Sequence, residues 1–306
     1  MKTLFLIDAN SIIHRSFHAL PPLTTPDGKP AGALYGISSV LLRLLRLERP
    51  EYVAALFDRP EPTFRKKEFK EYKAQRPAAP SELISQIIEA HNVFTAFGIK
   101  TFEAPGFEAD DLIATLAEKY KRDPDTKVII LTGDMDTLQL VEGEKIVVRV
   151  FKKGITETVT YDDKAVEEKY GLKPNQVIDY KALVGDPSDN IKGVPGVGPK
   201  TATELLKKFG SVEEVYKAAA ADPKLGSKLL QFREEATRSK RLVTLKHDVP
   251  ITLENLEELK IGENEASIKK YFEKLGFKTL AARLGEEKNE TKKTAKKPQK
   301  RDQAMF

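Results

Sequence analysis

The chain has 306 residues, of which 40% are hydrophobic and 32% are charged, and its formal net charge is +5 at pH 7. It contains no cysteine, which excludes disulfide frameworks, thiol nucleophiles and thiolate metal sites. No stretch approaches the roughly 18 apolar residues that a membrane-spanning helix needs, and the apolar run at the N-terminus is too short for a signal peptide. We therefore expect a cytoplasmic protein with no membrane partner.

The first half of the sequence alternates strand-like and helix-like segments. Short apolar runs typical of buried strands lie at 3–7, 52–57, 99–102 and 127–131, and segments with helical periodicity lie between them at 33–47, 81–97 and 109–120. A glycine turn at 152–154 then predicts a hairpin that leads to a strand at 158–161. Strands alternating with helices predict an α/β fold with a largely parallel central sheet and helices on both faces.

The second half has a different character. From about residue 162 the chain is mainly helical and polar, with glycine turns between the helical segments. Residues 286–306 are rich in lysine, glutamate and threonine without apolar periodicity, which predicts disorder. We therefore expect three parts: an α/β core at 1–170, a helical part at 171–285 and a disordered basic tail at 286–306.

Acidic residues follow each predicted strand. They are Asp8, then Asp58, then Glu108, Asp110 and Asp111, then Asp134 and Asp136, with Asp186 and Asp189 in a later acidic string. Ligands bind at the carboxyl ends of parallel strands in open α/β sheets, so we expect these acids to meet at one edge. Taken singly, such an acid is more often a helix cap or a turn residue. Together they would repel one another unless neutralised, and hard divalent cations prefer oxygen ligands, so the set predicts a metal-dependent enzyme.

A basic segment lies close to these acids in the sequence. Residues 61–76 contain six lysines and arginines against three glutamates. Basic surface beside an acidic metal site suits a substrate with a phosphate backbone. For any single run of charges, a solvated helix face is the alternative interpretation.

A glycine-rich turn is the second strong motif. It contains Gly193, Gly196 and Gly198, followed by Lys200 and Thr201, between predicted helices at 175–184 and 200–209. Glycine lets backbone N–H groups approach a phosphate closely, and the helix that follows adds its N-terminal dipole. The helical flanks distinguish the turn from a Walker P-loop, which follows a buried strand. The motif predicts sequence-independent contact with duplex backbone, and a purely structural turn is the alternative.

These strings together resemble the 5′-nuclease (flap endonuclease) family, and most closely the N-terminal 5′→3′ exonuclease domain of bacterial DNA polymerase I. The resemblance covers residues 2–284 and rests on LID at 6–8, ALFD at 55–58, FR at 64–65, EYKAQR at 71–76, EADD at 108–111, TGDMD at 132–136 and GDPSDNI at 185–191. It implies a PIN/5′-nuclease-like core with a basic arch around 61–92, and a helix–three-turn–helix DNA-binding element at about 175–210. The implied activity is structure-specific 5′→3′ exonuclease or flap endonuclease cleavage of phosphodiester bonds in replication and repair.

The resemblance also implies cofactors and ligands. Two divalent cations, Mg²⁺ or Mn²⁺, would activate a water and stabilise the leaving oxygen. One ion would take ligands among Asp8, Asp58, Glu108 and Asp110, and the other would be served by Asp111, Asp134, Asp136, Asp186 and Asp189. In the glycine turn, backbone carbonyls would hold a K⁺ ion.

Contacts with DNA are implied in the same way. Arg65, Lys73 and Arg76 would contact phosphates, Tyr72 would stack on a base near the scissile bond, and Arg15 would lie near the scissile phosphate. Lys73 and Arg76 would also stabilise charge that grows in the transition state. Lys192 and Lys200 would touch duplex phosphates beside the three glycines. The four histidines show no paired ligand spacing, and we expect structural or surface roles for them.

Three other classes remain as alternatives. A PIN-type ribonuclease is usually much shorter and lacks the glycine turn. A phosphatase with an aspartate nucleophile needs Asp-x-Asp after the first strand, whereas residues 8–10 read Asp-Ala-Asn. A non-catalytic DNA-binding relative would be expected to have lost some of the acids.

Partners follow from the resemblance too. The implied substrate is DNA with a 5′ flap, a nick or a gap, or an RNA primer, and a polymerase domain would act in cis or in trans. We expect a monomer. Since a polymerase would continue several hundred residues past 284, we expect either a stand-alone exonuclease or a fragment.

Overall fold

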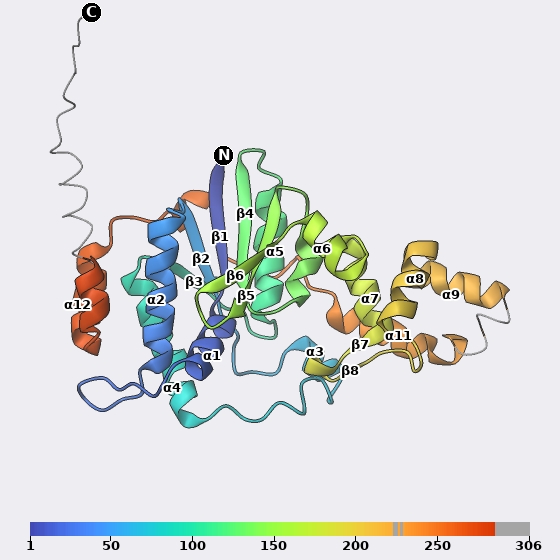
Figure 1. Ribbon diagram of the computed structural model, residues 1–306, viewed down its shortest axis with the longest axis horizontal. Coiled ribbons are helices and arrows are strands. Elements are labelled where there is room, and N and C mark those ends of the chain that lie inside the picture. Colours follow the sequence, from blue (N-terminus) through green and yellow to red (C-terminus); the bar gives the residue numbers. More distant parts are fainter. Residues whose placement is uncertain (223–225, 227–228, 285–306) are drawn as a thin grey trace, which may run out of the picture.

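The computed structural model describes residues 1–222, 226 and 229–284, so the tail predicted to be disordered lies outside the described residues. Its centre is a six-stranded sheet in the order β3-β2-β1-β4-β5-β6 (Figure 1). The strands are β1 (Lys2–Asp8), β2 (Tyr52–Leu56), β3 (Lys100–Phe102), β4 (Thr126–Thr132), β5 (Ile146–Lys153) and β6 (Glu157–Tyr161). The first five are parallel and β6 is antiparallel to β5, which confirms the largely parallel sheet.

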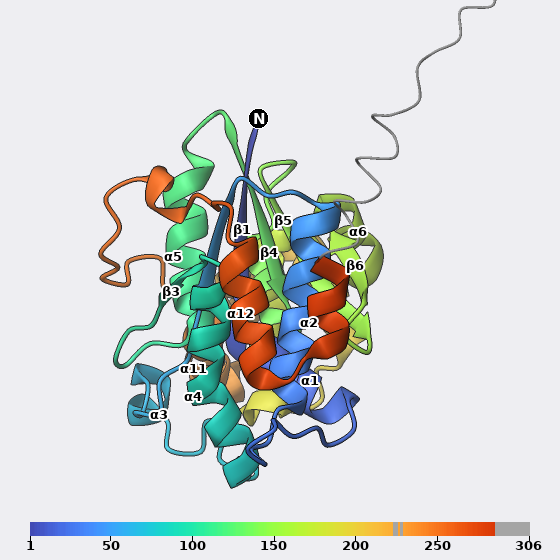
Figure 2. The same cartoon turned by 90° about the vertical axis from the view of Figure 1, so that its left-hand side faces the viewer.

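Helices cover both faces of this sheet. On one face lie α1 (Ala9–Ala19), α2 (Gly32–Leu47) and α4 (Ser81–Ala96), and α12 (Glu265–Leu275) packs on the outer side of these helices (Figure 2). The other face packs against α5 (Ala109–Lys121), the 3₁₀ turn η1 (Asp136–Leu140) and the chain around η5 (Leu256–Leu259). All five residues of β2 are buried, as expected for a strand covered on both sides.

A helical part lies beside the sheet in Figure 1. It contains α6 (Asp163–Tyr170), η2 (Pro174–Gln176), α7 (Val177–Val184), α8 (Pro199–Phe209), α9 (Val212–Ala221), η4 (Leu230–Phe232) and α11 (Arg233–Val243). Its own apolar cluster includes Leu183, Leu206 and Val215, all fully buried. Helix α11 packs along α7 and returns the chain toward the sheet.

Two short segments connect this part to the carboxyl edge of the sheet. Strands β7 (Gly185–Asp186) and β8 (Ile191–Lys192) pair around the 3₁₀ turn η3 (Pro187–Asp189). The basic segment forms α3 (Phe64–Glu68), a turn through residues 69–76 and an extended run up to α4. The two segments meet, because the backbone N–H of Lys73 donates to the carbonyl of Asp189 over 3.0 Å.

Among the helices that the structure describes, none is both long enough and apolar enough to cross a membrane.

Candidate metal centre and nucleic-acid interface

A cavity of about 300 Å³ lies at the carboxyl edge of the sheet. Its walls carry the carboxylates of Asp8, Asp58, Glu108, Asp110 and Asp134, together with Asn10, Ser11, His14, Lys73 and Arg76. The acids come from the end of β1, the loop after β2, the start of α5 and the loop after β4. These five of the nine predicted acids therefore meet where the parallel topology predicted.

The end of β1 fixes two of these acids. Asp8 caps α1, since its Oδ1 accepts from the N–H of Ser11 over 3.0 Å. Its Oδ2 accepts a hydrogen bond of 2.7 Å from the hydroxyl of Thr132, the last residue of the neighbouring strand β4. The same hydroxyl oxygen accepts from the N–H of Asp134 over 2.9 Å. One threonine thus links the carboxylate of Asp8, at the end of β1, to the backbone of Asp134, which follows β4.

The loop after β2 and the first turn of α5 fix the opposite wall. The Oδ1 of Asp58 accepts from the N–H of Ala109 over 2.7 Å, so its charge lies at the helix N-terminus, where an anion is favoured. The N–H of Asp58 in turn donates to Asn10 over 3.1 Å. Asp110 follows in the same turn, and its Oδ1 is buried without a hydrogen-bond partner among the described residues.

The cavity carries more negative charge than the protein neutralises. Burial and the charge of Asp58 raise the pKa of Asp8 to about 7. Burial, together with the charges of Asp134 and Asp8, raises the pKa of Asp110 well above its usual value. The pKa of Asp58 is also raised, because many protein atoms surround its carboxylate even though the residue is exposed on the cavity wall.

This environment fits a divalent cation. Several carboxylates and one unpartnered buried oxygen face a shared space, and carboxylate oxygens are the ligands that Mg²⁺ accepts. Within the described residues no three acidic or histidine side chains already form a closed ligand set. The carboxylates instead line an open cavity, which suits an ion that keeps several of its waters.

The remaining predicted ligands lie outside this cavity, and protein cations already pair with them. Asp136 and Asp186 both contact the ammonium of Lys181. Asp189 accepts from Arg76 over 2.5 Å and from the hydroxyl of Tyr72 over 3.0 Å.

Asp111 and Arg65 correct two predictions. Arg65 is 1% exposed and Asp111 is 0% exposed. The two terminal nitrogens of Arg65 each donate to one Asp111 oxygen over 2.7 Å, and its remaining donors reach the carbonyls of Leu242 and Thr244. Both oxygens of Asp111 also accept backbone N–H groups. Asp111 is therefore not placed as a metal ligand, and Arg65 is not placed to contact a phosphate.

Tyr72 is a third correction. The ring is 3% exposed and packs with Ile191, Leu242 and Val243, so its faces are closed to a nucleotide base. Its hydroxyl lies 3.0 Å from an oxygen of Glu108 and 3.0 Å from one of Asp189. Tyr72 supports the edge of the cavity from inside the protein.

Lys73 and Arg76 line the cavity wall. The ammonium of Lys73 is 2.9 Å from Glu108 and 3.7 Å from Asp189. Burial lowers the pKa of Lys73, but the carboxylates of Glu108 and Asp189 more than offset this and the net shift is upward. Arg76 remains about half exposed, at 49%.

Arg15 and His14 differ from their predicted placements. Arg15 lies over the ring of Phe151 and donates to the carbonyl of Gly154, and it is absent from the residues that line the cavity. His14 lines the cavity although we predicted a structural or surface role for it. Burial, His18 and Arg76 lower the pKa of His14, which favours the neutral imidazole. No local pattern in the sequence marks His14, because Asn10, one turn before it on α1, is itself identified as a cavity residue only by the structure.

The glycine turn presents an exposed surface before α8. Gly196, Gly198, Lys200 and Thr201 are exposed, whereas a Cβ on Gly193 would lie 2.2 Å from the carbonyl carbon of Val184. Gly193 thus permits close backbone packing, and the other two glycines leave the turn open. Lys192, on β8, is exposed beside it.

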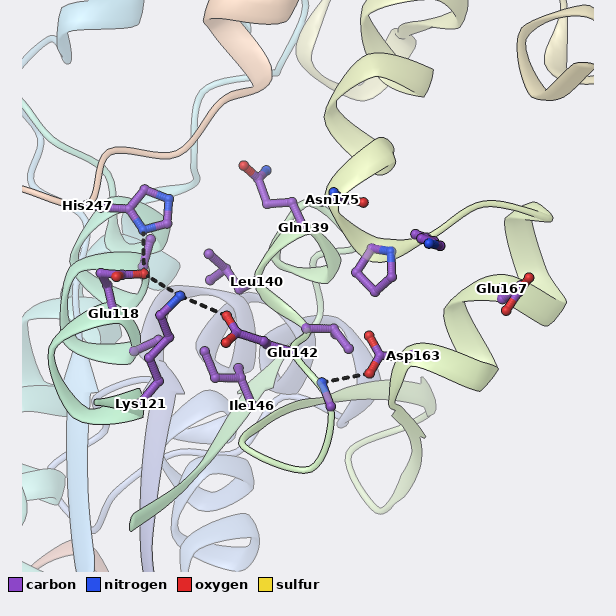
Figure 3. A pocket seen from close by; sticks show the side chains of 16 residues that line it. Glu118, Lys121, Gln139, Leu140, Glu142, Ile146, Asp163, Glu167, Asn175 and His247 are labelled. Atoms are coloured by element: carbon purple, nitrogen blue, oxygen red, sulfur yellow. Dashed lines mark hydrogen bonds and ion pairs between the residues drawn. The ribbon is translucent and has the colours of Figure 1, made fainter. Parts of the chain in front are cut away.

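A second cavity, of about 590 Å³, lies between α5, η1 and α6, and several of its charged side chains pair with one another (Figure 3). Lys121 contacts Glu118 over 2.9 Å and Glu142 over 2.7 Å, and Asp163 accepts from the N–H of Gly143 over 2.6 Å. Lys121 thus neutralises two of the carboxylates of this larger cavity, whereas burial raises the pKa values of Asp8 and Asp110 in the cavity at the sheet edge.

Known proteins resemble both parts of the chain. Residues 3–171 match the family described as 5′-3′ exonuclease, N-terminal resolvase-like domain, and residues 172–267 match its C-terminal SAM fold. A 5′-3′ exonuclease of Aquifex aeolicus is 40% identical over 92% of this chain and 94% of its own length. DNA polymerase I of Bacillus subtilis is 42% identical over 94% of this chain, which spans 33% of that relative's length.

Solved structures share the fold. A bacteriophage T5 D15 flap endonuclease, in a pseudo-enzyme–product complex with DNA and metal ions, superposes with a TM-score of 0.64 over 93% of this chain and 98% of its own, at 21% identity. The catalytic core of Rad2 in complex with DNA gives a TM-score of 0.57 over 92% of each chain, at 17% identity. With the family matches across both parts, the chain belongs to the 5′-3′ exonuclease family.

Proposed function

We propose that the chain is a metal-dependent 5′→3′ exonuclease and flap endonuclease that hydrolyses phosphodiester bonds at the 5′ end or flap junction of duplex DNA. The observation that carries this proposal is the cavity in which Asp8, Asp58, Asp110 and Asp134 meet. The buried Oδ1 of Asp110, without a partner in the described chain, gives the cavity a site for a cation. Family membership supports the same activity.

The four carboxylates would hold Mg²⁺ or Mn²⁺, and the metal ions in the T5 D15 complex support this assignment. A bound divalent ion supplies an activated water and neutralises charge on the scissile phosphate. A second ion would draw on Asp134, Asp136 and Asp186, and the latter two first have to part from Lys181. A K⁺ ion at the carbonyls of the glycine turn remains a prediction.

The protein's own cations would position the substrate. Lys73 and Arg76 face the cavity and are held there by Glu108 and Asp189. A phosphate at the cavity mouth would exchange with these carboxylates, and the two cations would stabilise the negative charge that develops on it during hydrolysis. Their ion pairs keep both groups positioned before substrate binds.

The glycine turn would hold the duplex. Gly196, Gly198, Lys200 and Thr201 are exposed at the N-terminus of α8, where backbone N–H groups and the helix dipole favour a phosphate. Lys192 would add a second cation. These contacts read the backbone and carry no base specificity, so the preference for a flap, a nick, a gap or an RNA primer would come from the shape of the substrate.

The partners follow from the relatives. DNA polymerase I relatives are about three times as long as this chain, so a polymerase domain in cis or in trans would extend the nicked strand while this activity removes the 5′ segment. We propose that the nuclease works as a monomer in the bacterial cytosol, where chromosomal DNA lies.

A labelled flap substrate tests the activity. We expect the purified chain to release a short 5′ fragment, cut near the single-strand junction, in Mg²⁺ and not in EDTA. An intact flap in Mg²⁺ despite tight binding would instead identify a non-catalytic DNA-binding protein. Cleavage of single-stranded RNA in preference to the DNA flap would identify a PIN-type ribonuclease.

A further inference from the structure

Lys181 occupies an unusual position between two of the acids. It lies on α7, and its ammonium contacts carboxylate oxygens of Asp136 and Asp186, at 2.7 Å from the latter. The side chains of all three residues are 11% exposed. Since one ammonium reaches both carboxylates, their oxygens lie close enough to share a single cation. A positive charge of the protein therefore already fills the space between two predicted metal ligands.

The group formed by Lys181, Asp136 and Asp186 is linked by a hydrogen bond to the acidic cavity. The N–H of Asp136 donates to the Oδ1 of Asp134 over 2.9 Å, and Asp134 lines the cavity. On the other side, the Oδ1 of Asp186 accepts from the N–H of Ser188 over 2.9 Å and from its hydroxyl over 2.5 Å. Backbone N–H groups thus hold the carboxylates of Asp134 and Asp186, and the flexible partner of Asp136 and Asp186 is the lysine, with its four-carbon stem.

The nine acids accordingly divide into two classes. Asp8, Asp58, Asp110 and Asp134 share a cavity, and Asp110 keeps an unpartnered oxygen there. In the second class each acid is paired with a cation of the protein: Asp111 with Arg65, Asp136 and Asp186 with Lys181, and Asp189 with Arg76. Glu108 belongs to both classes, because it lines the cavity and also pairs with Lys73. The first class fits a divalent ion as it stands. The second class does not, because a metal would have to displace a cation of the protein.

We propose that the Lys181 ammonium competes with a second divalent ion for Asp136 and Asp186. The free protein then binds one ion tightly in the cavity, and it admits a second ion only when Lys181 withdraws. This inference rests on the proposed metal-dependent function and adds a residue that sets how many ions bind. A largely buried lysine shared by two carboxylates is a stronger competitor than an exposed ion pair, which contributes little.

Mn²⁺ binding to the whole chain without DNA tests this directly, by calorimetry or by the loss of the free-ion signal in electron paramagnetic resonance. In the wild type we expect one tight site and one weak site. Lys181→Met should tighten the weak site by about tenfold or more, a change of about 1.4 kcal/mol, and leave the tight site unchanged. Lys181→Arg keeps the positive charge and should keep the second site weak.

Two further variants locate the effect. Lys240 also pairs with two carboxylates, Asp179 and Glu213, away from the acidic edge. Lys240→Met should leave both Mn²⁺ affinities as in the wild type. Adding Asp186→Asn to Lys181→Met should weaken the second site again, because the freed ligand is lost. Lys181→Gln serves as a second neutral variant if circular dichroism shows that the methionine variant is unfolded.

The results separate this inference from the function on which it rests. The proposed competition between Lys181 and the second ion is overturned if the two neutral variants bind the second ion no more tightly than the wild type does. The tight site would still stand in that case, and with it the metal-dependent nuclease. Absence of any Mn²⁺ binding in the wild type would overturn both.

Discussion

Arg65 holds Asp111 through both of its terminal nitrogens, each 2.7 Å from a carboxylate oxygen, and neither residue exposes more than 1% of its surface. We expect Arg65→Ala to lower the free energy of unfolding by about 3–5 kcal/mol, because it leaves a buried carboxylate unpaired. Urea unfolding measures this. Lys67→Ala, at an exposed position of the same helix, should change it by less than about 0.5 kcal/mol. If the two variants were equally stable, the Arg65–Asp111 ion pair would not stabilise the fold.

The cavity acids should show the opposite effect on stability when no metal is bound. Because the carboxylate of Asp110 is buried beside other acids, which raises its pKa, Asp110→Asn should stabilise the metal-free protein by on the order of 1 kcal/mol at neutral pH. Urea unfolding in EDTA checks this, and the gain should shrink or reverse when Mg²⁺ is added. If Asp110→Asn were less stable than the wild type in EDTA, the cavity would not carry an excess of negative charge.

The pH dependence of stability follows from Asp8. Its pKa is about 7 in the fold against an ordinary value of 3.8. Between these values the folded chain binds more protons than the unfolded chain, so this group makes stability fall as pH rises and has no further effect above about pH 7. Unfolding in EDTA from about pH 5 to about pH 8 should show that fall. Mg²⁺ should flatten it, because a bound cation replaces the protons. If stability instead rose with pH over this range, both in the wild type and in Asp110→Asn, which keeps Asp8, the predicted contribution of Asp8 would be excluded.

Removal of a cavity carboxylate should separate binding from cleavage. Asp58→Ala and Asp134→Ala should lower flap cleavage by about a hundredfold or more, because each removes an oxygen from the metal site. DNA affinity in EDTA should stay within about twofold of the wild type, since neither carboxylate attracts a phosphate. Single-turnover cleavage and fluorescence anisotropy measure the two quantities. Cleavage at the wild-type rate in either variant would disprove the assignment of the metal site.

Lys200 should act on duplex binding alone. We expect Lys200→Ala to weaken binding equally across sequences and to reduce the slope of log affinity against log salt by about one phosphate contact. Lys217→Ala, on α9 in an exposed pair with Glu214, is the matched control and should leave the slope unchanged. A loss that depends on sequence would indicate that bases are read in addition to the backbone.

Two glycines of the same turn should differ in their tolerance of alanine. Gly193→Ala should cost about 2 kcal/mol or more, because the new Cβ would meet the backbone of Val184. Gly198 has a φ of −89° and open space around its Cβ position, so Gly198→Ala should cost less than about 1 kcal/mol. Thermal unfolding of the two variants compares them directly. Equal midpoints would contradict the close approach at Gly193.

The sequence predicted the sheet and five acids of the cavity because both follow from local pattern. Strand periodicity and parallel topology bring Asp8, Asp58 and Asp134 to one edge, whatever the details of packing. Pairing between distant charges has no such local signal. Arg65 lies 46 positions from Asp111 and looks like surface in the sequence, since arginine is rarely buried unless it is paired.

The same limit explains the other corrections. The family resemblance implied contact with a nucleic acid for Tyr72 and Arg15, yet Tyr72 closes a small apolar cluster and Arg15 lies over Phe151. No local pattern in the sequence marks Lys181, because its importance comes from Asp136 and Asp186 together, and only the folded chain brings these two acids to one ammonium.

Two consecutive residues of α5 face in different directions, and this ties the metal cavity to the hydrophobic core. Asp110 borders the cavity, while Asp111 is clamped by Arg65 and by the backbone of residue 246. The first turn of α5 cannot open on its own without breaking a fully buried ion pair. Hydrogen exchange at these amides should therefore proceed through global rather than local unfolding, so the cavity stays preorganised until the whole domain melts.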